Sequence, residues 1–382
     1  MQKNQFGQLA DIRQQEIGTF MPRFLITIMT LEDLGYHPLL EQYRMEHQLK
    51  SFETGRVLAE HKERYIIRTE SGEYEAEITG NLRFTAKSRE DYPAVGDWVA
   101  ATVFEGDLAI IHHILPRSSV IKRQAVGQHG EIQIIAANID YAMLVQAADR
   151  DFNVNRLERY LTICYAANVE PVIVLTKTDL ADAGRLSEII VQIKRRIDQV
   201  PVVAISNSTL TGYDELKKII EKGKTYCMLG SSGVGKSTLL NNLSGQAVMR
   251  TDAISSSTGK GRHVTSHREL TVLESGGILI DNPGMREVGI ADTAGGLEAT
   301  FDRILSLAGA CRYADCTHVG EAGCAVLEAL RAGVLDEASY ENWLKLERER
   351  AHYESTVADR RRKDRKFGKM LKDYQKRGGG NE

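Results

Sequence analysis

The sequence predicts a multidomain α/β protein with a phosphate-binding loop near its centre, a small β-barrel before it and a helical, metal-binding segment after it. The pattern Gly230-x-x-x-x-Gly235-Lys236-Ser237 lies between an apolar run and leucines at helical spacing. Apolar runs alternate with helical patterns from about residue 130 to 300, and three cysteines crowd near the carboxyl end. A chain of 382 residues is also too long for one ordinary core.

Composition limits the classes of function. With 42% hydrophobic and 26% charged residues the chain has the balance of a soluble globular protein, and no apolar run is long enough to span a bilayer. No secretory pattern opens the sequence, so we expect a cytoplasmic protein. The net charge of -3 gives no global attraction to nucleic acid, which leaves local basic patches to supply any such binding.

The first 28 residues show no clear period and predict no element. Met29 reads well as a chain start, because Thr30 can cap a helix that begins before Leu31 and Leu34. Residues 1–50 are therefore predicted to be an extension followed by a short helical segment.

Residues 51–117 change to short alternating segments separated by turn signals such as Ser71-Gly72 and Gly96-Asp97. Five such segments begin at Gly55, Arg64, Tyr74, Asp97 and Leu108. Five short strands over this length predict a small closed barrel, and the oligonucleotide-binding (OB) fold is the commonest barrel with that strand count.

Basic residues are distributed along the predicted barrel: Arg56, Lys62, Arg64, Arg68, Arg83, Lys87 and Arg89. Such charges are consistent with a solvated face and equally with contacts to an RNA backbone. Both interpretations stay open at this level.

The segment 117–130 is predicted to be a polar connector, and residues 118–300 a domain built on a parallel sheet. Its strands are expected in the apolar runs at 141–145, 172–175 and 202–205, in the run before the phosphate loop and at 277–280. Helical patterns separate the runs, so helices should cover both faces of the sheet.

The phosphate loop supplies the first part of a nucleotide site. Its glycines allow successive backbone N–H groups to face a phosphate at a helix N-terminus. Lys236 would reach the β- and γ-phosphates, and the Ser237 hydroxyl would bind Mg²⁺. The other expected phosphate contacts are Gly230, Ser231, Ser232, Gly233, Val234, Gly235 and Thr238. The alternative is an ordinary glycine-rich turn between a strand and a helix.

The run Thr176-Lys177-Thr178-Asp179 follows a predicted strand and indicates which base is bound. A carboxylate there can accept hydrogen bonds from N1–H and the 2-amino group of guanine, whereas adenine has no such pair of donors. Lys177 can lay its alkyl stem on the base, and the backbone at Ser206 and Asn207 can face guanine O6. These residues predict GTP or GDP as ligand, although Lys-x-Asp alone is also a common helix cap.

Two further segments are candidates for the γ-phosphate and the metal. Asp281, at a predicted strand end, can hold Mg²⁺ through water, and the N–H of Gly284 can follow the γ-phosphate. In the polar, glycine-rich segment 255–267 we assign Thr265 to Mg²⁺.

These motifs resemble those of the Ras-type GTPases, but the base-recognition segments come first and the phosphate motifs follow. This circularly permuted order, after a barrel and before a cysteine cluster, is similar to the bacterial ribosome small subunit-dependent GTPase A family. The similarity covers residues 30–372 and includes Gly261-Arg-His and Asp281-x-Pro-Gly-x-Arg-Glu. In this chain Val264 stands where the family usually shows Thr, and Asn207 where a small residue such as Ala is more usual.

The resemblance implies a monomeric GTPase in late maturation of the small (30S) ribosomal subunit. It implies that the protein contacts 16S rRNA and binds the subunit with GTP, and that subunit-stimulated hydrolysis to GDP releases it. Two other classes stay open from the residues: an ATP-dependent phosphotransferase or ATPase, and a non-enzymatic RNA-binding scaffold that holds GTP.

The position where Ras-type enzymes carry a water-orienting Gln is Met285 here, so the intrinsic rate should be low. His263 is the candidate for positioning the attacking water, because an imidazole can accept a hydrogen bond near neutral pH. The alternative is a solvated or phosphate-facing histidine. With Lys236, Thr265 and Asp281 it completes the predicted catalytic set.

The pattern Cys311-x4-Cys316-x-His318-x5-Cys324 predicts one structural Zn²⁺, since three thiolates and an imidazole form a closed tetrahedral set. Buried core cysteines are the alternative. Apolar residues beyond it have helical spacing, so residues 301–382 are predicted to be a mostly helical zinc-binding domain. Its tail at 360–372 carries eight basic residues against one acidic, and we expect it to contact rRNA.

Overall fold

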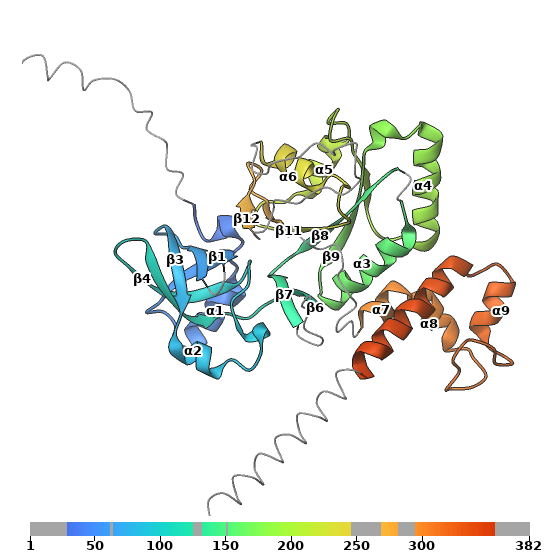
Figure 1. The fold of residues 1–382 in the computed structure, drawn as a ribbon, viewed down its shortest axis with the longest axis horizontal. Helices are drawn as coiled ribbons and strands as arrows, with labels where there is room; N and C mark the ends of the chain where they lie inside the picture. Colours follow the sequence, from blue (N-terminus) through green and yellow to red (C-terminus); the bar gives the residue numbers. More distant parts are fainter. Residues whose placement is uncertain are drawn as a thin grey trace, which may run out of the picture.

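The computed structural model describes residues 29–61, 64–124, 132–149, 152–245, 269–281 and 295–355. In Figure 1 a barrel lies at one end, a sheet covered by helices lies in the middle, and a group of helices lies at the other end. The predictions for residues 1–28, Lys62, His263, Thr265, Gly284, Met285 and the basic tail concern residues outside these ranges. Within them, no helix has the length and apolar character needed to cross a bilayer.

A short N-terminal segment packs against the barrel. It holds a 3-10 turn, η1 (Glu32–Leu34), and the helix α1 (Pro38–Glu46), which begins with proline at its first position, where no N–H partner is needed. Leu34, Leu40 and Leu49 are buried in one apolar cluster with Trp98 and Leu115 of the barrel. This segment therefore covers part of the barrel surface.

The barrel closes as predicted. Its strands are β1 (Glu53–His61), β2 (Arg64–Arg68), β3 (Glu73–Ile78), β4 (Trp98–Phe104) and β5 (Leu108–Ile114). They pair in the order β1-β2-β3-β5-β4, and β4 pairs back to β1, with only β3 and β5 parallel. Alternate side chains such as Val57, Ile67 and Ile111 fill the interior. Between β3 and β4 lie α2 (Gly80–Thr85) and η2 (Arg89–Asp91).

The prediction of a polar connector over residues 117–130 is partly wrong. Val120–Gln124 form β6, which pairs antiparallel with β7 (Ile132–Ala137) in a two-stranded sheet. Ile121 is completely buried, while its neighbours Val120 and Lys122 are half-buried, within a polar stretch of the sequence. The burial of one apolar face decides the strand.

The central sheet has parallel strands in the order β10-β9-β8-β11-β13, and the antiparallel β12 follows β13 and pairs in turn with β1 of the barrel. The bounds are β8 (Tyr141–Ala147), β9 (Glu170–Thr176), β10 (Val202–Ala204), β11 (Thr225–Leu229), β12 (Glu269–Val272) and β13 (Ile278–Asp281). The strand β12 was not predicted, because its four residues follow a long polar segment. The parallel sheet itself confirms the prediction.

Helices cover both faces of this sheet, because successive strand residues point to opposite sides. On one face Leu144 and Ile173 pack with α3 (Val154–Ala166) and α4 (Ala183–Arg196). On the other, Met143 and Val145 pack with α5 (Tyr213–Ile219) and α6 (Lys236–Ser244). Figure 1 shows these layers.

A buried arginine joins the barrel to the central sheet. Arg56 of β1 is 1% exposed and donates to the carbonyl oxygens of Leu34, Gly96 (3.3 Å) and Asn138 (3.1 Å). It also donates to the Thr225 hydroxyl at 2.9 Å, at the start of β11. Burial lowers its pKa to about 10, which leaves the guanidinium charged at neutral pH. One side chain thus fixes three segments against each other.

The carboxyl-terminal helices are α7 (Gly296–Thr300), α8 (Asp302–Ala308), α9 (Ala325–Arg331) and a helix over 337–355. They dock on α3 through Glu158, which is 2% exposed. Its carboxylate accepts from Arg196, from the Ser339 hydroxyl at 3.0 Å and from Asn342 at 2.6 Å. Burial raises the pKa of Glu158, while Arg196 favours its charged form.

We expect Arg56→Met to destabilise the protein by roughly 3 kcal/mol or more, because several buried carbonyl groups would lose their only charged donor. Arg64→Met is the matched control: that side chain is 70% exposed in a 3.4 Å ion pair, and its loss should cost within about 0.5 kcal/mol. Urea unfolding measures both. Equal, small losses would show that the buried arginine does not hold the barrel to the sheet.

Candidate functional site

The phosphate-loop motif connects β11 to α6 at the carboxyl edge of the parallel sheet. Gly230 follows the strand, and a side chain there would approach the Val145 carbonyl oxygen to 2.4 Å. Gly235, with φ of 96°, is the N-cap of α6. Ser231, Ser232, Gly233 and Val234 form the turn between them, while Lys236, Ser237 and Thr238 begin the helix. Both glycines meet backbone requirements that a larger residue cannot.

Lys236 lies folded over its own loop. Its Nζ donates to the carbonyl oxygens of Gly230 at 2.6 Å and Ser231 at 2.7 Å. The ammonium group is therefore positioned above the turn, where successive backbone N–H groups and a helix N-terminus favour an anion. The arrangement can hold a phosphate chain.

Asp179 lies on the neighbouring loop after β9, in the turn η3 (Thr178–Leu180). Its two carboxylate oxygens accept from the hydroxyls of Ser206 (2.7 Å) and Ser208 (2.9 Å), which lie after β10. These two hydrogen bonds, that from Ser206 first, lower the pKa of the Asp179 carboxyl. The exposed Asp179 carboxylate is thus held ionised and in one orientation. Both features suit a group that accepts hydrogen bonds from two donors of a ligand.

Thr176 and Lys177 tie this loop to its neighbours. The buried Thr176 hydroxyl donates to the carbonyl oxygen of Val234 in the phosphate loop at 2.6 Å. Lys177 has a left-handed backbone, with φ of 57°, and its ammonium pairs with Asp149 at 3.1 Å. The end of β9 and the phosphate loop are therefore joined by a direct hydrogen bond.

Asn207 completes the connection between the predicted base segments and the phosphate loop. Its Nδ2 donates to the Gly235 carbonyl oxygen at 3.0 Å. Because Ser206 holds Asp179 and Asn207 touches Gly235, the structure places Asp179 and the phosphate loop at the same edge of the sheet. Segments that lie up to 58 residues apart in the sequence thereby line one region.

The remaining predicted residues of this region are only partly described. Asp281 is the last residue of β13, which is the strand beside β11. Its position at the carboxyl end of that strand is described, but its side chain is not. His263, Thr265 and Gly284 lie outside the described residues.

A second site lies among the carboxyl-terminal helices. One ligand atom each of Cys311, Cys316, His318 and Cys324 lies within 4.8 Å of the others. The Nδ1 of His318 is 3.5 Å from the sulfurs of Cys311 and Cys324, and these sulfurs are 3.9 Å apart. A tetrahedral Zn²⁺ with usual bond lengths requires about 3.6 Å for N···S and about 3.8 Å for S···S. The cluster could hold zinc, with Nδ1 as the imidazole ligand.

Glu321 organises the loop that carries His318. Its carboxylate accepts from the backbone N–H of Thr317 (2.9 Å), Val319 (3.0 Å) and Gly320 (3.1 Å), and from the Thr317 hydroxyl. These contacts, the Thr317 hydroxyl first, hold the pKa of Glu321 well below its usual range. They also fix the left-handed backbone of His318, where φ is 59°.

Sequence reasoning missed several supporting residues. Asp149, Tyr213, Asn242 and Glu321 were not predicted as parts of either site. Asp149 could have been found, because it follows the strand β8 and parallel strands bring their carboxyl ends to one edge. Tyr213 and Asn242 lie on helices and carry no sequence signal for a loop contact.

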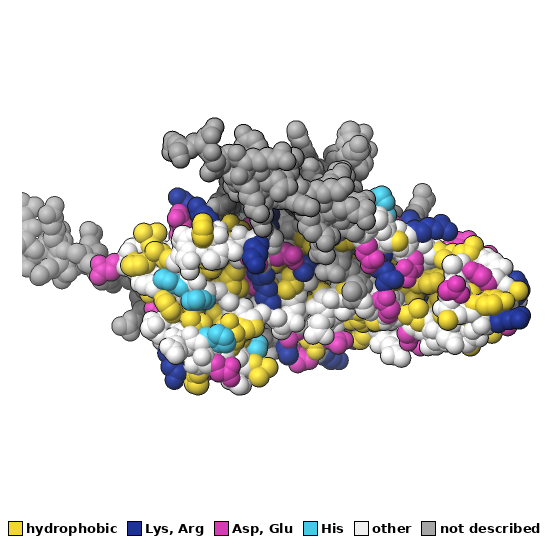
Figure 2. All heavy atoms as spheres, turned by 90° about the horizontal axis from the view of Figure 1, so that it is seen from below, with side chains coloured by type: hydrophobic (Ala, Val, Ile, Leu, Met, Phe, Trp, Pro, Cys, Tyr) yellow, Lys and Arg dark blue, Asp and Glu magenta, His cyan; other side chains and the backbone are white. Residues whose placement is uncertain are grey.

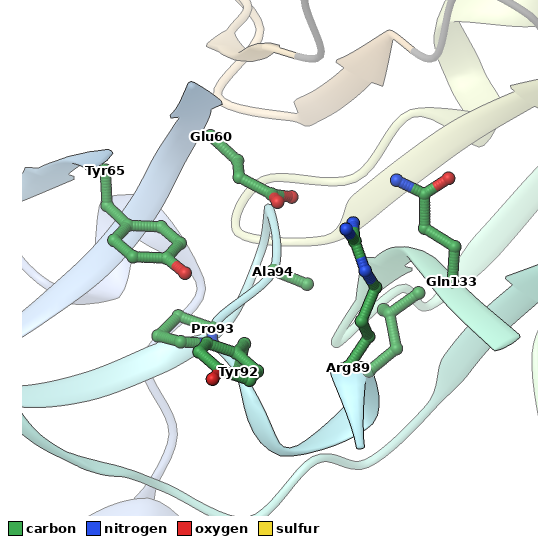
Figure 3. A pocket seen from close by; sticks show the side chains of 8 residues that line it. Glu60, Tyr65, Arg89, Tyr92, Pro93, Ala94 and Gln133 are labelled. Carbon is green, nitrogen blue, oxygen red and sulfur yellow. The ribbon is translucent and has the colours of Figure 1, made fainter. Parts of the chain in front are cut away.

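A cavity of about 440 Å³ lies elsewhere, between the barrel, η2 and β7. Figure 3 shows the polar ends of Glu60, Arg89 and Gln133 around it, with Tyr65, Tyr92 and Pro93 as further lining residues. None of the lining residues belongs to the phosphate loop or to the cysteine cluster. The cavity is therefore separate from both sites.

The chain is similar to known proteins over most of its length. Residues 114–291 match the model of the RsgA GTPase family. Over 345 residues the chain is 39% identical to the small ribosomal subunit biogenesis GTPase RsgA 1 of Bacteroides thetaiotaomicron, covering 90% of this chain and 96% of the relative. It is 40% identical over 326 residues to RsgA 2 of Listeria monocytogenes serotype 4b, covering 85% and 90% of the two chains.

Solved structures share the architecture. The crystal structure of YjeQ from Thermotoga maritima aligns with a TM-score of 0.58 at 25% identity, over 80% of this chain and 98% of the other. The crystal structure of YloQ, described as a circularly permuted GTPase, aligns with the same score and coverage. The order of base segments and phosphate loop observed here is that permuted order. The chain belongs to the RsgA GTPase family, and it is a GTP-hydrolysing enzyme with a circularly permuted GTPase fold.

Proposed function

We propose that this protein hydrolyses GTP during maturation of the small (30S) ribosomal subunit, binding the subunit with GTP and leaving it after hydrolysis to GDP. The proposal that the protein binds GTP is supported by the hydrogen bonds that link Asp179, through Ser206 and Asn207, to Gly235. It gives one edge of the sheet both a carboxylate fit for guanine and a loop fit for phosphates. The proposal that the partner is the small ribosomal subunit rests on the names of the relatives.

In this proposal each loop has one task. Asp179 accepts from guanine, and Thr176, Lys177, Ser206 and Asn207 shape the base pocket. Lys236 exchanges its two carbonyl partners for the β- and γ-phosphates, which costs little because both states keep it hydrogen-bonded. Mg²⁺, bound with the nucleotide, would be held by Ser237, Asp281 and Thr265, and Gly284 would contact the γ-phosphate.

Contact with 16S rRNA is proposed for the barrel and for the basic tail. On the face shown in Figure 2, Lys and Arg side chains are interspersed with acidic ones, which matches the near balance of the whole chain. RNA binding would therefore depend on local groups such as the barrel arginines and the 360–372 segment. We propose a monomer that acts in the cytoplasm.

We also propose the division into an extension (1–50), barrel (51–117), GTPase domain (118–300) and zinc domain (301–382). The zinc domain docks on α3 through Glu158, and the chain reaches it directly after Asp281 and the following segment. Loss of the γ-phosphate near Asp281 would then move this domain, and that movement would release the protein from the ribosomal subunit.

We expect Asp179→Asn to weaken GTP binding roughly 100-fold, because the amide can no longer accept from both guanine donors. The same variant should gain affinity for xanthosine triphosphate, whose base presents an acceptor at that edge. Fluorescence titration with GTP and with xanthosine triphosphate measures this change in nucleotide preference. An ATP-using enzyme would show no such change in preference.

We expect purified protein to contain one Zn²⁺ per chain, and Cys316→Ser to lose it while GTP binding is kept. Strong chelators should lower the melting temperature of the wild type, since structural zinc contributes folding free energy. Asp315→Asn, an exposed neighbour, is the control that should retain the metal. Zinc-free protein that melts normally in chelator would contradict the proposal.

We expect small ribosomal subunits to stimulate GTP hydrolysis by the wild type, since Met285 cannot orient water. His263→Ala should keep GTP affinity but lose the stimulation, whereas His267→Ala in the same segment should behave as wild type. Phosphate release with and without subunits is the assay. Stimulated turnover in His263→Ala would remove that residue from the mechanism, and absence of turnover in the wild type would remove the enzymatic proposal.

A further inference from the structure

Asn207 makes a side-chain contact that the usual small residue at this position could not make. Its Nδ2 donates to the carbonyl oxygen of Gly235, the N-cap of the phosphate-loop helix, at 3.0 Å. A Cβ added to Gly235 would lie only 2.6 Å from the same Nδ2. The side chain therefore rests directly on the glycine, and the close approach depends on both residues.

The amide of Asn207 is fixed from its other end as well. The hydroxyl of the buried Tyr213 donates to Asn207 Oδ1 at 2.7 Å. The Gly235 carbonyl can only accept, so Nδ2 must face it and Oδ1 must face the tyrosine. The orientation of the amide thus follows from its partners.

Asn242 of α6 closes the network about two helical turns beyond Gly235. Its Nδ2 lies 3.0 Å from the backbone oxygen of Asn207 and 2.9 Å from the Tyr213 hydroxyl, as a donor to both. The loop after β10 is consequently held to α6 at two points, one at the helix start and one further along it. Ser206, one residue earlier, holds Asp179.

We propose that the Asn207–Tyr213–Asn242 network is a positioning device that sets the rate of nucleotide release, by locking the guanine loop to the phosphate loop. Asn207 is a positioning residue here and touches no reacting atom. The inference rests on the proposed binding of GTP at this edge of the sheet.

The physical reason is preorganisation. A nucleotide that contacts Asp179 with its base and Lys236 with its phosphates is held by two separate loops, and it leaves when either loop moves away. Fixing the loops to each other removes that motion and lowers the ordering cost of binding. Differences of this kind are expressed mainly in dissociation rates.

The test is GDP release from the full chain, measured with a fluorescent GDP chased by unlabelled GDP. Asn207→Ala and Tyr213→Phe should each release GDP roughly five- to tenfold faster, because each variant removes two hydrogen bonds of the network. The double variant should be little faster than the faster single one, because both act through one network. Asn81→Ala, on the exposed surface of α2, is the control.

Steady-state GTP hydrolysis separates positioning from a general loss of structure. Tyr213→Phe should raise KM for GTP while kcat at saturation stays near the wild-type value, whereas a loosened fold would lower both kcat and the melting temperature without nucleotide. GDP release at the wild-type rate in both single variants overturns the inference. Independent, multiplying effects in the double variant also overturn it. Wild-type protein that binds no guanine nucleotide would instead refute the proposed function.

Discussion

The site depends on one constraint of parallel sheets: the carboxyl ends of neighbouring strands meet at one edge. The strands β9, β8 and β11 are neighbours, although the phosphate-loop strand follows the base-recognition strand in the chain. Asp179 and Gly235 are linked through Ser206 and Asn207, because the loops that follow β9, β10 and β11 lie at the same edge. Chain order is irrelevant to this geometry, which is why a permuted order of motifs can build the same pocket.

Two buried charged groups attach the rest of the protein to that sheet. Arg56 holds the barrel against the start of β11, and Glu158 holds the carboxyl-terminal helices against α3. A buried charge is costly unless its partners are complete, so each contact tolerates only one arrangement of the parts it joins. Neighbouring parts are thereby given defined positions relative to the nucleotide site, which a hydrophobic contact alone would specify less sharply.

Each site also contains a residue with a left-handed backbone in a loop that polar contacts hold in place. Lys177 and His318 both have left-handed backbones, and each lies in a loop fixed by polar contacts: Thr176 with Val234 in the first, Glu321 with backbone N–H groups in the second. Such conformations persist only where the surroundings determine them.

The sequence by itself determined the barrel, the parallel sheet, the phosphate loop and the cysteine set, because each follows from local spacing: alternation for strands, a fixed glycine pattern, and ligands within 14 residues. It missed β6, β12 and the network of Asn207, Tyr213 and Asn242. Only the tertiary structure decided these, since the burial of Ile121 and the approach of Asn207 to Gly235 join segments whose distance in space no local pattern records.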